Sequence, residues 1–550
     1  MTIQRIPLGE WLPDQPGLVG GITKAQNCYP TATGYAPFPS EAYFSDAADE
    51  NLLSLAFSKD QSGTIKLFAA GTDKIYSVDS VGALTQVWYT SGTYAQSGTT
   101  TLTVTATAHG WKTGDSVYLN FTSGTATDGQ FTITKINADS FTVTTTSATT
   151  TGNVRISATE TGFSTPTNQR FRFTRFGNRT IAANFGVRLQ SFVADTSTSF
   201  RNLADDAPIA KFVTVVRDFV VAANTTSAGG DHPYRVQWSG INDETTWTTS
   251  QITQADYQDI PDGGHITGIR GGEFGLILME KAIHRMTYVG TPFIFQFDNI
   301  SREKGCIASG SVSQYQGLTF LLSDDGFYMC DGQQVVPIGA EKVDRYFFND
   351  ADPDFTTMSS AVDPVRKLVM WNYKNKFAER MLLIYSFSTK KWSSAVADSD
   401  YISDATTASV TVEQLDDINA SLDALAVSLD SNIYAGGKYF LGGTSGTKVV
   451  TFNGANKTAT IETGDISTGG RSMVTMAKPQ VDNGSASIAL ASRGLLNEVV
   501  TFGTSSAANS DNRVSIRGGG NYHRLQITPT GDNWKMAVAV DVDVIPQGVR

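Results

Sequence analysis

Basic residues are scarce in this sequence, and their scarcity is the first constraint on function. The chain of 550 residues carries 42 Lys and Arg against 53 Asp and Glu, which gives a formal net charge of −11. Proteins that grip duplex DNA by its phosphates need a basic surface. The charge balance therefore argues against a DNA-gripping protein, although it does not exclude DNA passing nearby.

Proline, cysteine and long apolar runs are also rare. Only 17 residues are Pro, which excludes collagen-like and proline-rich disordered chains. No apolar run approaches the roughly 20 residues of a membrane helix, and Met1 to Glu10 has no stretch of signal-peptide type. Three widely spaced cysteines, Cys28, Cys306 and Cys330, favour buried, reduced thiols over a disulfide framework and predict synthesis in the cytoplasm.

What is plentiful is strand and turn chemistry: Thr, Ser, Gly, Val and aromatic residues. An apolar strand, a polar turn and a second strand recur at a spacing of roughly 40 to 60 residues, which is typical of a β-propeller. The seven pairs of predicted strands are 65–71 with 74–78, 179–184 with 188–192, 218–223 with 234–238, 275–279 with 283–287, 318–322 with 326–329, 367–371 with 382–386, and 432–436 with 448–452. We therefore predict an all-β fold with a propeller-like core of about seven blades. The motifs of WD40 and kelch repeats are absent.

Composition divides the chain into four parts. Residues 1–92 hold an N-terminal segment and the first blade, and residues 93–158 form an inserted, Thr-rich small β-domain. The remaining blades span 159–457, and 458–550 predicts a separate C-terminal β-sandwich. The charges of the inserted domain cancel, which favours a spacer or decorative module.

One segment, 411–430, has a helical pattern. Thr411 and Gln414 fit a capping box. Apolar residues then follow at alternating spacings of three and four, which predicts a packing seam. The seam consists of Leu415, Ile418, Leu422, Leu425 and Leu429. Two interpretations stay open: the helix packs on its own propeller, or it contacts another subunit.

Acidic residues concentrate around this helix. From Ser393 to Asn432 the chain has no Lys or Arg. It carries eight acids there, namely Asp398, Asp400, Asp404, Glu413, Asp416, Asp417, Asp423 and Asp430. These residues are candidates for an acidic belt that lines a channel or meets a basic partner. The alternative is a solvated outer surface.

Motifs for catalysis and cofactors are missing. The five histidines have no partners at metal-ligand spacing, no complete phosphate loop occurs, and no Gly-x-Ser-x-Gly elbow is present. Ser323 to Gly326 is the nearest approach to the Asp-box of a sialidase, an enzyme that also needs an acid, a nucleophile and an arginine cluster in its central cleft. We therefore expect no metal, no cofactor and no catalytic residues, and a protein that is not an enzyme.

The run from Arg170 to Phe176 alternates basic and aromatic residues. Such a run could bind single-stranded nucleic acid by charge and stacking. In a strand, however, Arg170 and Arg172 share one face while Phe171 and Phe173 share the other. The simpler prediction is that the Phe side chains enter the core and the Arg side chains face solvent or a neighbour.

Several short motifs together resemble a known family. They are Asp218-Phe219-Val220-Val221, Val236-Gln237-Trp238-Ser239, Ile260-Pro261-Asp262-Gly263-Gly264, Gly272-Glu273-Phe274-Gly275, Ser323-Asp324-Asp325-Gly326-Phe327-Tyr328 and Tyr522-His523-Arg524-Leu525. The combination resembles the tail nozzle proteins of short-tailed bacteriophages, also called tail hub, tubular B-type or stabilisation proteins. The resemblance covers most of the chain outside 93–158 and 395–430, and its motifs are structural turns.

The resemblance implies a structural virion protein located in the tail. Such proteins form a homo-oligomeric ring, expected here to be hexameric, below the adaptor (head-completion) protein and the portal. They continue the DNA channel, gate it for genome retention and ejection, and carry fibres, spikes or a needle. DNA would pass through the lumen without sequence-specific binding. The alternative is a phage-borne propeller that binds a receptor or a glycan.

Overall fold

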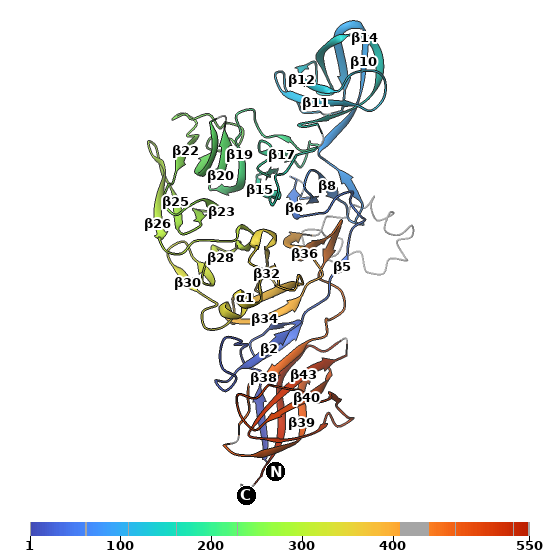
Figure 1. Cartoon of the computed structure of the whole chain (residues 1–550). Helices are drawn as coiled ribbons and strands as arrows, with labels where there is room; N and C mark the ends of the chain where they lie inside the picture. The colour runs from blue at the N-terminus through green and yellow to red at the C-terminus, as the bar shows by residue number, and fades with distance from the viewer. Residues whose placement is uncertain are drawn as a thin grey trace.

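The chain is elongated and consists of three parts in a row. The computed structural model describes residues 2–60, 63–107, 109–160, 162–227, 229–406, 439–467, 469–531 and 533–547. Figure 1 shows a small β-domain at one end, a propeller in the middle and a β-sandwich at the other end, where both termini lie. The predicted helix at 411–430, with its whole leucine seam, lies outside the described residues.

In the described part of the chain the propeller has seven blades of four antiparallel strands. Six of them are separate sheets, and the strands of blade 6 belong to a larger, nine-stranded sheet. Blades 1 to 3 are β6 (Ser54–Lys59), β7 (Ile65–Ala70), β8 (Ile75–Val78), β9 (Leu84–Gln86); β15 (Arg172–Phe176), β16 (Arg179–Ala183), β17 (Gln190–Val193), β18 (Arg201–Asn202); and β19 (Ile209–Val216), β20 (Phe219–Ser227), β21 (Gly230–Trp238), β22 (Asp256–Asp259). Blades 4 and 5 are β23 (Ile266–Arg270), β24 (Gly275–Met279), β25 (Ile283–Gly290), β26 (Ile294–Ser301); and β27 (Ser313–Tyr315), β28 (Leu318–Leu322), β29 (Phe327–Cys330), β30 (Val335–Pro337).

Blades 6 and 7 complete the ring. They are β31 (Ser359–Asp363), β32 (Leu368–Lys374), β33 (Arg380–Ser386), β34 (Lys391–Val396); and β35 (Tyr401–Thr406), β36 (Tyr439–Ser445), β37 (Lys448–Thr451), β5 (Ala42–Tyr43). The first strand of each blade lies innermost. Strand β6 of blade 1 contacts both β15 of blade 2 and β35 of blade 7, which closes the circle.

The prediction of an all-β, propeller-like core is confirmed. Six of the seven predicted strand pairs are the second and third strands of blades 1 to 6. In blade 7 the predicted strand 432–436 lies outside the described residues, and β36 begins at Tyr439. Buried aliphatic and aromatic side chains fill the spaces between blades, as at Phe68, Phe171 and Phe200 between blades 1 and 2. Burial of this apolar surface is the main force that holds the blades together.

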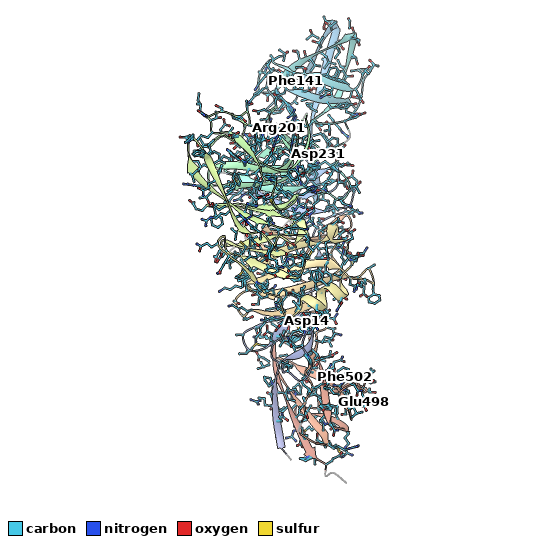
Figure 2. All side chains as sticks on the ribbon, turned by 60° about the vertical axis from the view of Figure 1, so that its left-hand side comes forward. Asp14, Phe141, Arg201, Asp231, Glu498 and Phe502 are labelled. Atoms are coloured by element: carbon cyan, nitrogen blue, oxygen red, sulfur yellow. The ribbon has the colours of Figure 1, made fainter. Side chains whose placement is uncertain are left out.

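The inserted domain is a five-stranded sheet of β10 (Tyr89–Thr105), β11 (Ser116–Phe121), β12 (Gly129–Thr132), β13 (Thr134–Lys135) and β14 (Ser140–Ser157). It has its own core, centred on residues such as Phe141 and Trp111. Arg201 of blade 2 fixes it by donating a hydrogen bond to the His109 carbonyl at 2.8 Å. Figure 2 shows Arg201 between the inserted domain and the propeller. Gly110 has a positive φ of 67°, and a Cβ there would overlap the Arg201 guanidinium.

Both ends of the chain build the sandwich. Its strands are β1 (Thr2–Pro7), β2 (Ile22–Gln26), β3 (Cys28–Pro30), β4 (Tyr35–Pro37), β38 (Thr460–Thr463), β39 (Ser472–Asp482), β40 (Ser485–Arg493), β41 (Ser506–Ala507), β42 (Val514–Gly520), β43 (Tyr522–Thr530) and β44 (Met536–Pro546). Strand β1 pairs with β44. Strand β2 pairs with β38 and touches β34, so one sheet of nine strands runs from blade 6 into the sandwich.

Helical structure is minor in the described part of the chain. It comprises α1 (Asp344–Asp350) and the 3₁₀ turns Ser309–Ser311 and Phe355–Thr357. No described helix has the length and apolar character needed to cross a membrane. The three cysteines are buried and unpaired, in agreement with the prediction.

Candidate functional site

A cavity of about 400 Å³ lies at the centre of the propeller. Its wall includes residues from β6, β15, β19, β23, β31 and β35 and from the segment just before β27, so every blade contributes. Exposed side chains on this wall, those of Arg175 and Asp404, show that the cavity is open to solvent. Its volume falls in the range typical of small-molecule sites, roughly 300 to 1,000 Å³.

The ionisable lining of the cavity is strongly basic. Four arginines line it, Arg170, Arg172, Arg175 and Arg270, and one carboxylate, Asp404. This local charge is opposite in sign to the net charge of the chain. The cavity is therefore a site where an anion gains energy and a cation loses it.

Two arginines reach across the propeller axis. Arg172 starts on β15 in blade 2 and donates to Ser309 Oγ at 2.9 Å, at the start of blade 5. Arg170 precedes β15 and donates to the Met358 carbonyl at 3.1 Å, at the start of blade 6. Both partners are three blades away, the largest separation in a ring of seven. These side chains therefore cross the axis.

Aromatic rings hold the guanidinium groups in place. Arg172 lies over Phe212, 4.6 Å from the ring centroid, and Arg170 lies 5.2 Å from the centroid of Tyr401. Such cation–π contacts stabilise a guanidinium plane without using its N–H donors. Hydrogen bonds to described residues use one donor on Arg170 and one on Arg172, out of about five on each guanidinium. The remaining donors have no acceptor among the described residues and can bind a ligand from fixed positions.

The arginines lack acidic partners in the described ranges. No described carboxylate oxygen lies within 4.0 Å of the guanidinium nitrogens of Arg170, Arg172 or Arg270. Burial lowers the pKa of all three, and that of Arg172 falls well below its ordinary value. Repulsion from Arg270 lowers the pKa of Arg170 and Arg172 further. A bound anion would relieve both effects, because it neutralises like charges in a poorly solvated space.

Asp404 faces the same cavity from β35. Its side chain is exposed, so it lies on the solvent-accessible part of the cavity wall. Of the three described acids of the predicted belt, Asp404 alone lines this site. Asp398 pairs with Lys457 at 3.2 Å, and Asp400 accepts a hydrogen bond from the Gly446 N–H. The other five acids of the belt lie outside the described residues.

The run from Arg170 to Phe176 follows the predicted alternation in part, because Phe173 is half-buried and lines the cavity together with the arginines. Phe171 is buried and packs against Phe163 with ring centroids 5.5 Å apart. The arginines face the central cavity, which the sequence did not reveal. The sequence alone does not show that β15 is the innermost strand of its blade. Arg270 was not recognised at all, although its place at the end of the strand before a Gly-Gly turn is a usable signal once the blades are aligned.

A metal site finds no support in the described ranges. No group of three or more His, Cys, Asp or Glu side chains is arranged to hold a metal there.

A second cavity, of about 620 Å³, lies between the inserted domain and blade 2, and Trp111 and Arg201 line it. That cavity is part of the contact between the inserted domain and blade 2.

Comparisons with known proteins do not assign the chain to a family. No family model and no curated protein matches the chain. Among solved structures, an exo-β-1,3-galactanase of Phanerochaete chrysosporium matches with a TM-score of 0.25 and 10% identity, over 68% of this chain and 95% of that one. An uncharacterised protein of Listeria monocytogenes matches with a TM-score of 0.26 and 7% identity, over 64% and 96%. A structure named only as a glycoside hydrolase matches with a TM-score of 0.21 and 10% identity, over 82% and 96%.

These matches correct one expectation. The sequence led us to expect that the chain is not an enzyme, yet two of the three structures bear the names of glycan-cleaving enzymes. That expectation is withdrawn. The low TM-scores and identities do not assign an activity to this chain in its place.

Proposed function

We propose that this chain is a receptor- or glycan-binding propeller of a phage virion, and that its central cavity takes a ligand with negative charge. The carrying observation is that three half-buried arginines share one cavity, with no described carboxylate within 4.0 Å of them. Unpaired charges in a desolvated space are costly. An anionic ligand offsets that cost and forms charge-assisted hydrogen bonds with the free N–H donors.

The site is organised before the ligand arrives. Phe212 and Tyr401 support two of the guanidinium groups, and Ser309 Oγ and the Met358 carbonyl anchor their ends. Side chains that are already fixed lose little conformational entropy on binding. Affinity in such a site depends on the charge and shape of the ligand more than on rearrangement of the protein.

The test is thermal unfolding of the full chain with sodium sulfate, against sodium chloride at equal ionic strength. Bound sulfate stabilises the folded state by about 1.4 kcal/mol at ten times its Kd. The site variant is Arg172→Gln. The matched control is Arg235→Gln, which removes a half-buried arginine that lies outside the cavity lining and pairs with Asp259 at 2.7 Å.

Sulfate also stabilises proteins non-specifically, so the comparison between variants decides. We expect a larger sulfate-dependent rise in Tm for the wild-type and control proteins than for Arg172→Gln. Equal rises in all three proteins would refute binding at the cavity.

The sequence resemblance supports a second candidate, a hexameric tail nozzle. In that case the DNA channel must lie between subunits, because Arg170 and Arg172 cross the axis of each propeller. The elongated shape, with the propeller between two other β-domains, suits a subunit that contacts different partners at its two ends (Figure 1). Electron microscopy of the purified protein mixed with its adaptor and portal tests this candidate. A ring with an axial hole supports it, and a monomer that ignores the adaptor rules it out.

A further inference from the structure

We infer that the ligand of the central cavity is a sugar acid at the end of a glycan chain. This inference rests on the proposed function and specifies its ligand. The arginines account for a negative group, but three further features of the wall restrict what carries it: an isolated carboxylate, a set of hydroxyl groups and a blocked axis.

The carboxylate is Asp404. An ionised carboxylate only accepts hydrogen bonds, so a ligand that touches it must offer O–H or N–H donors. A bare inorganic anion at the arginines offers no donor, and Asp404 repels it. A molecule that carries both a carboxylate and hydroxyl groups satisfies Arg170, Arg172 and Asp404 together.

Hydroxyl groups on the wall fit the same ligand. Ser309, Ser360 and Ser403 line the cavity. Ser309 Oγ already accepts a hydrogen bond from Arg172, and Ser360 Oγ donates to the Gly310 carbonyl at 2.9 Å. Hydroxyl groups can both donate and accept, as the hydroxyls of a sugar do. Apolar side chains, such as buried Ile402, line the same wall and can pack against sugar C–H groups.

The crossing arginines restrict the ligand to a chain end. Because Arg170 and Arg172 hydrogen-bond to blades on the far side of the axis, a polymer cannot thread through the propeller. The cavity, at about 400 Å³, holds a ligand of small-molecule size. The fitting unit is therefore a terminal sugar that enters from the open side, with the rest of the glycan outside.

Isothermal titration calorimetry of the full chain tests this inference with five probes. They are D-glucuronate, D-galacturonate, N-acetylneuraminate, neutral D-glucose and sodium sulfate. We expect at least one sugar acid to bind about tenfold more tightly than sulfate, since it gains charge-assisted hydrogen bonds that sulfate cannot form. Glucose should show no measurable binding.

Variants separate the two halves of the site. Asp404→Asn should weaken the bound sugar acid about tenfold while sulfate binding stays equal or tightens, because a repulsive charge is removed. Arg172→Gln should weaken both ligands. Arg172→Lys keeps the charge but loses the fork, so it should weaken the sugar acid more than sulfate. Arg235→Gln should change neither, and Tm measurements confirm that each variant is folded.

Two failures are distinguishable. If sulfate binds but no sugar acid binds more tightly, or if Asp404→Asn weakens both ligands equally, the sugar-acid inference is wrong while anion binding stands. If none of the anions binds the wild-type protein, anion binding at the cavity is wrong, and the sugar-acid inference falls with it.

Discussion

Buried arginines of the sandwich are paired with a carboxylate, whereas the arginines of the propeller cavity have no described carboxylate within 4.0 Å. In the sandwich, Arg493 and Arg524 both bind Asp465, at 2.5 Å and 3.0 Å, and the Asp465 side chain is only 3% exposed. Arg493 also donates to the carbonyls of Leu496 and Glu498. In the propeller, three half-buried arginines share a cavity with one described carboxylate, which lies beyond ion-pair distance.

This difference separates arginines that stabilise the fold from arginines that can bind a ligand. The cluster around Asp465 satisfies its own charges, so it needs no ligand, and its removal should damage the fold. The cavity arginines repel one another and lack such a partner among the described residues, so their removal should cost the fold little and binding much. Stability measurements can therefore distinguish the two regions.

The largest effect should follow Asp465→Asn. This change leaves two buried guanidiniums without their shared carboxylate, which typically costs about 3–5 kcal/mol. We expect a marked fall in Tm in differential scanning calorimetry and early loss of the sandwich. Asp511→Asn, at an exposed residue of the same domain, is the control. A Tm for Asp465→Asn within one degree of that of the control would show that the cluster is not structural.

A buried carboxyl group, that of Asp344, extends the comparison to acidic side chains. Burial raises its pKa to about 7, and its carboxylate accepts a hydrogen bond from the Phe327 N–H at 3.1 Å. The folded state therefore holds a proton that the unfolded state has released between about pH 4 and pH 7. The contribution of Asp344 to the free energy of unfolding is therefore fully present below about pH 4 and is lost as the pH rises through about 7.

Asp344→Asn should flatten that dependence. The amide oxygen can accept the same hydrogen bond without a charge. We expect the variant to gain on the order of 2–4 kcal/mol over wild type between pH 4 and pH 8, measured as the difference in free energy of unfolding. The Asp511→Asn control should show no such trend. A wild-type–variant difference that does not change with pH would contradict the raised pKa.

A smaller effect should follow Arg172→Gln in the absence of ligand. The variant loses a hydrogen bond and a cation–π contact, but it also removes a desolvated charge that two other arginines repel. The two changes oppose each other, so we expect a change in free energy of unfolding within about 1 kcal/mol. Arg493→Gln is the matched variant in the sandwich and should cost more. Equal losses would remove the distinction between the regions.

The smallest effect should follow deletion of the inserted domain. Tyr89 of β10 pairs with Ser157 of β14, so the ends of the insert lie side by side. Replacing residues 93–158 by a short Gly-Ser bridge should leave the propeller and sandwich folded, with a Tm within a few degrees of wild type. Limited proteolysis and calorimetry check this. Loss of soluble expression would show that the insert supports the core, beyond its contact with Arg201.

Strand hairpins were predictable because their signal is local. Alternation and turns placed β7 with β8 and β32 with β33 without knowledge of any neighbour. The pairing of β1 with β44 was not predictable. The two strands are more than 500 residues apart, and the sequence of a short strand does not specify which strand it pairs with. Residue order likewise showed that Arg170 and Arg172 share a face, but not that this face meets six other blades.

The placement of the first residues has a consequence for synthesis. Strands β1, β2 and β5 are synthesised more than 400 residues before the strands they pair with, β44, β38 and β37. Until then their edges stay open, and open edges invite pairing with other chains. Blade 7 cannot close on β5 before residue 451 exists, so the ring is completed late in translation or after it. If synthesis halts before residue 536, strand β1 has no partner, because β44 does not yet exist.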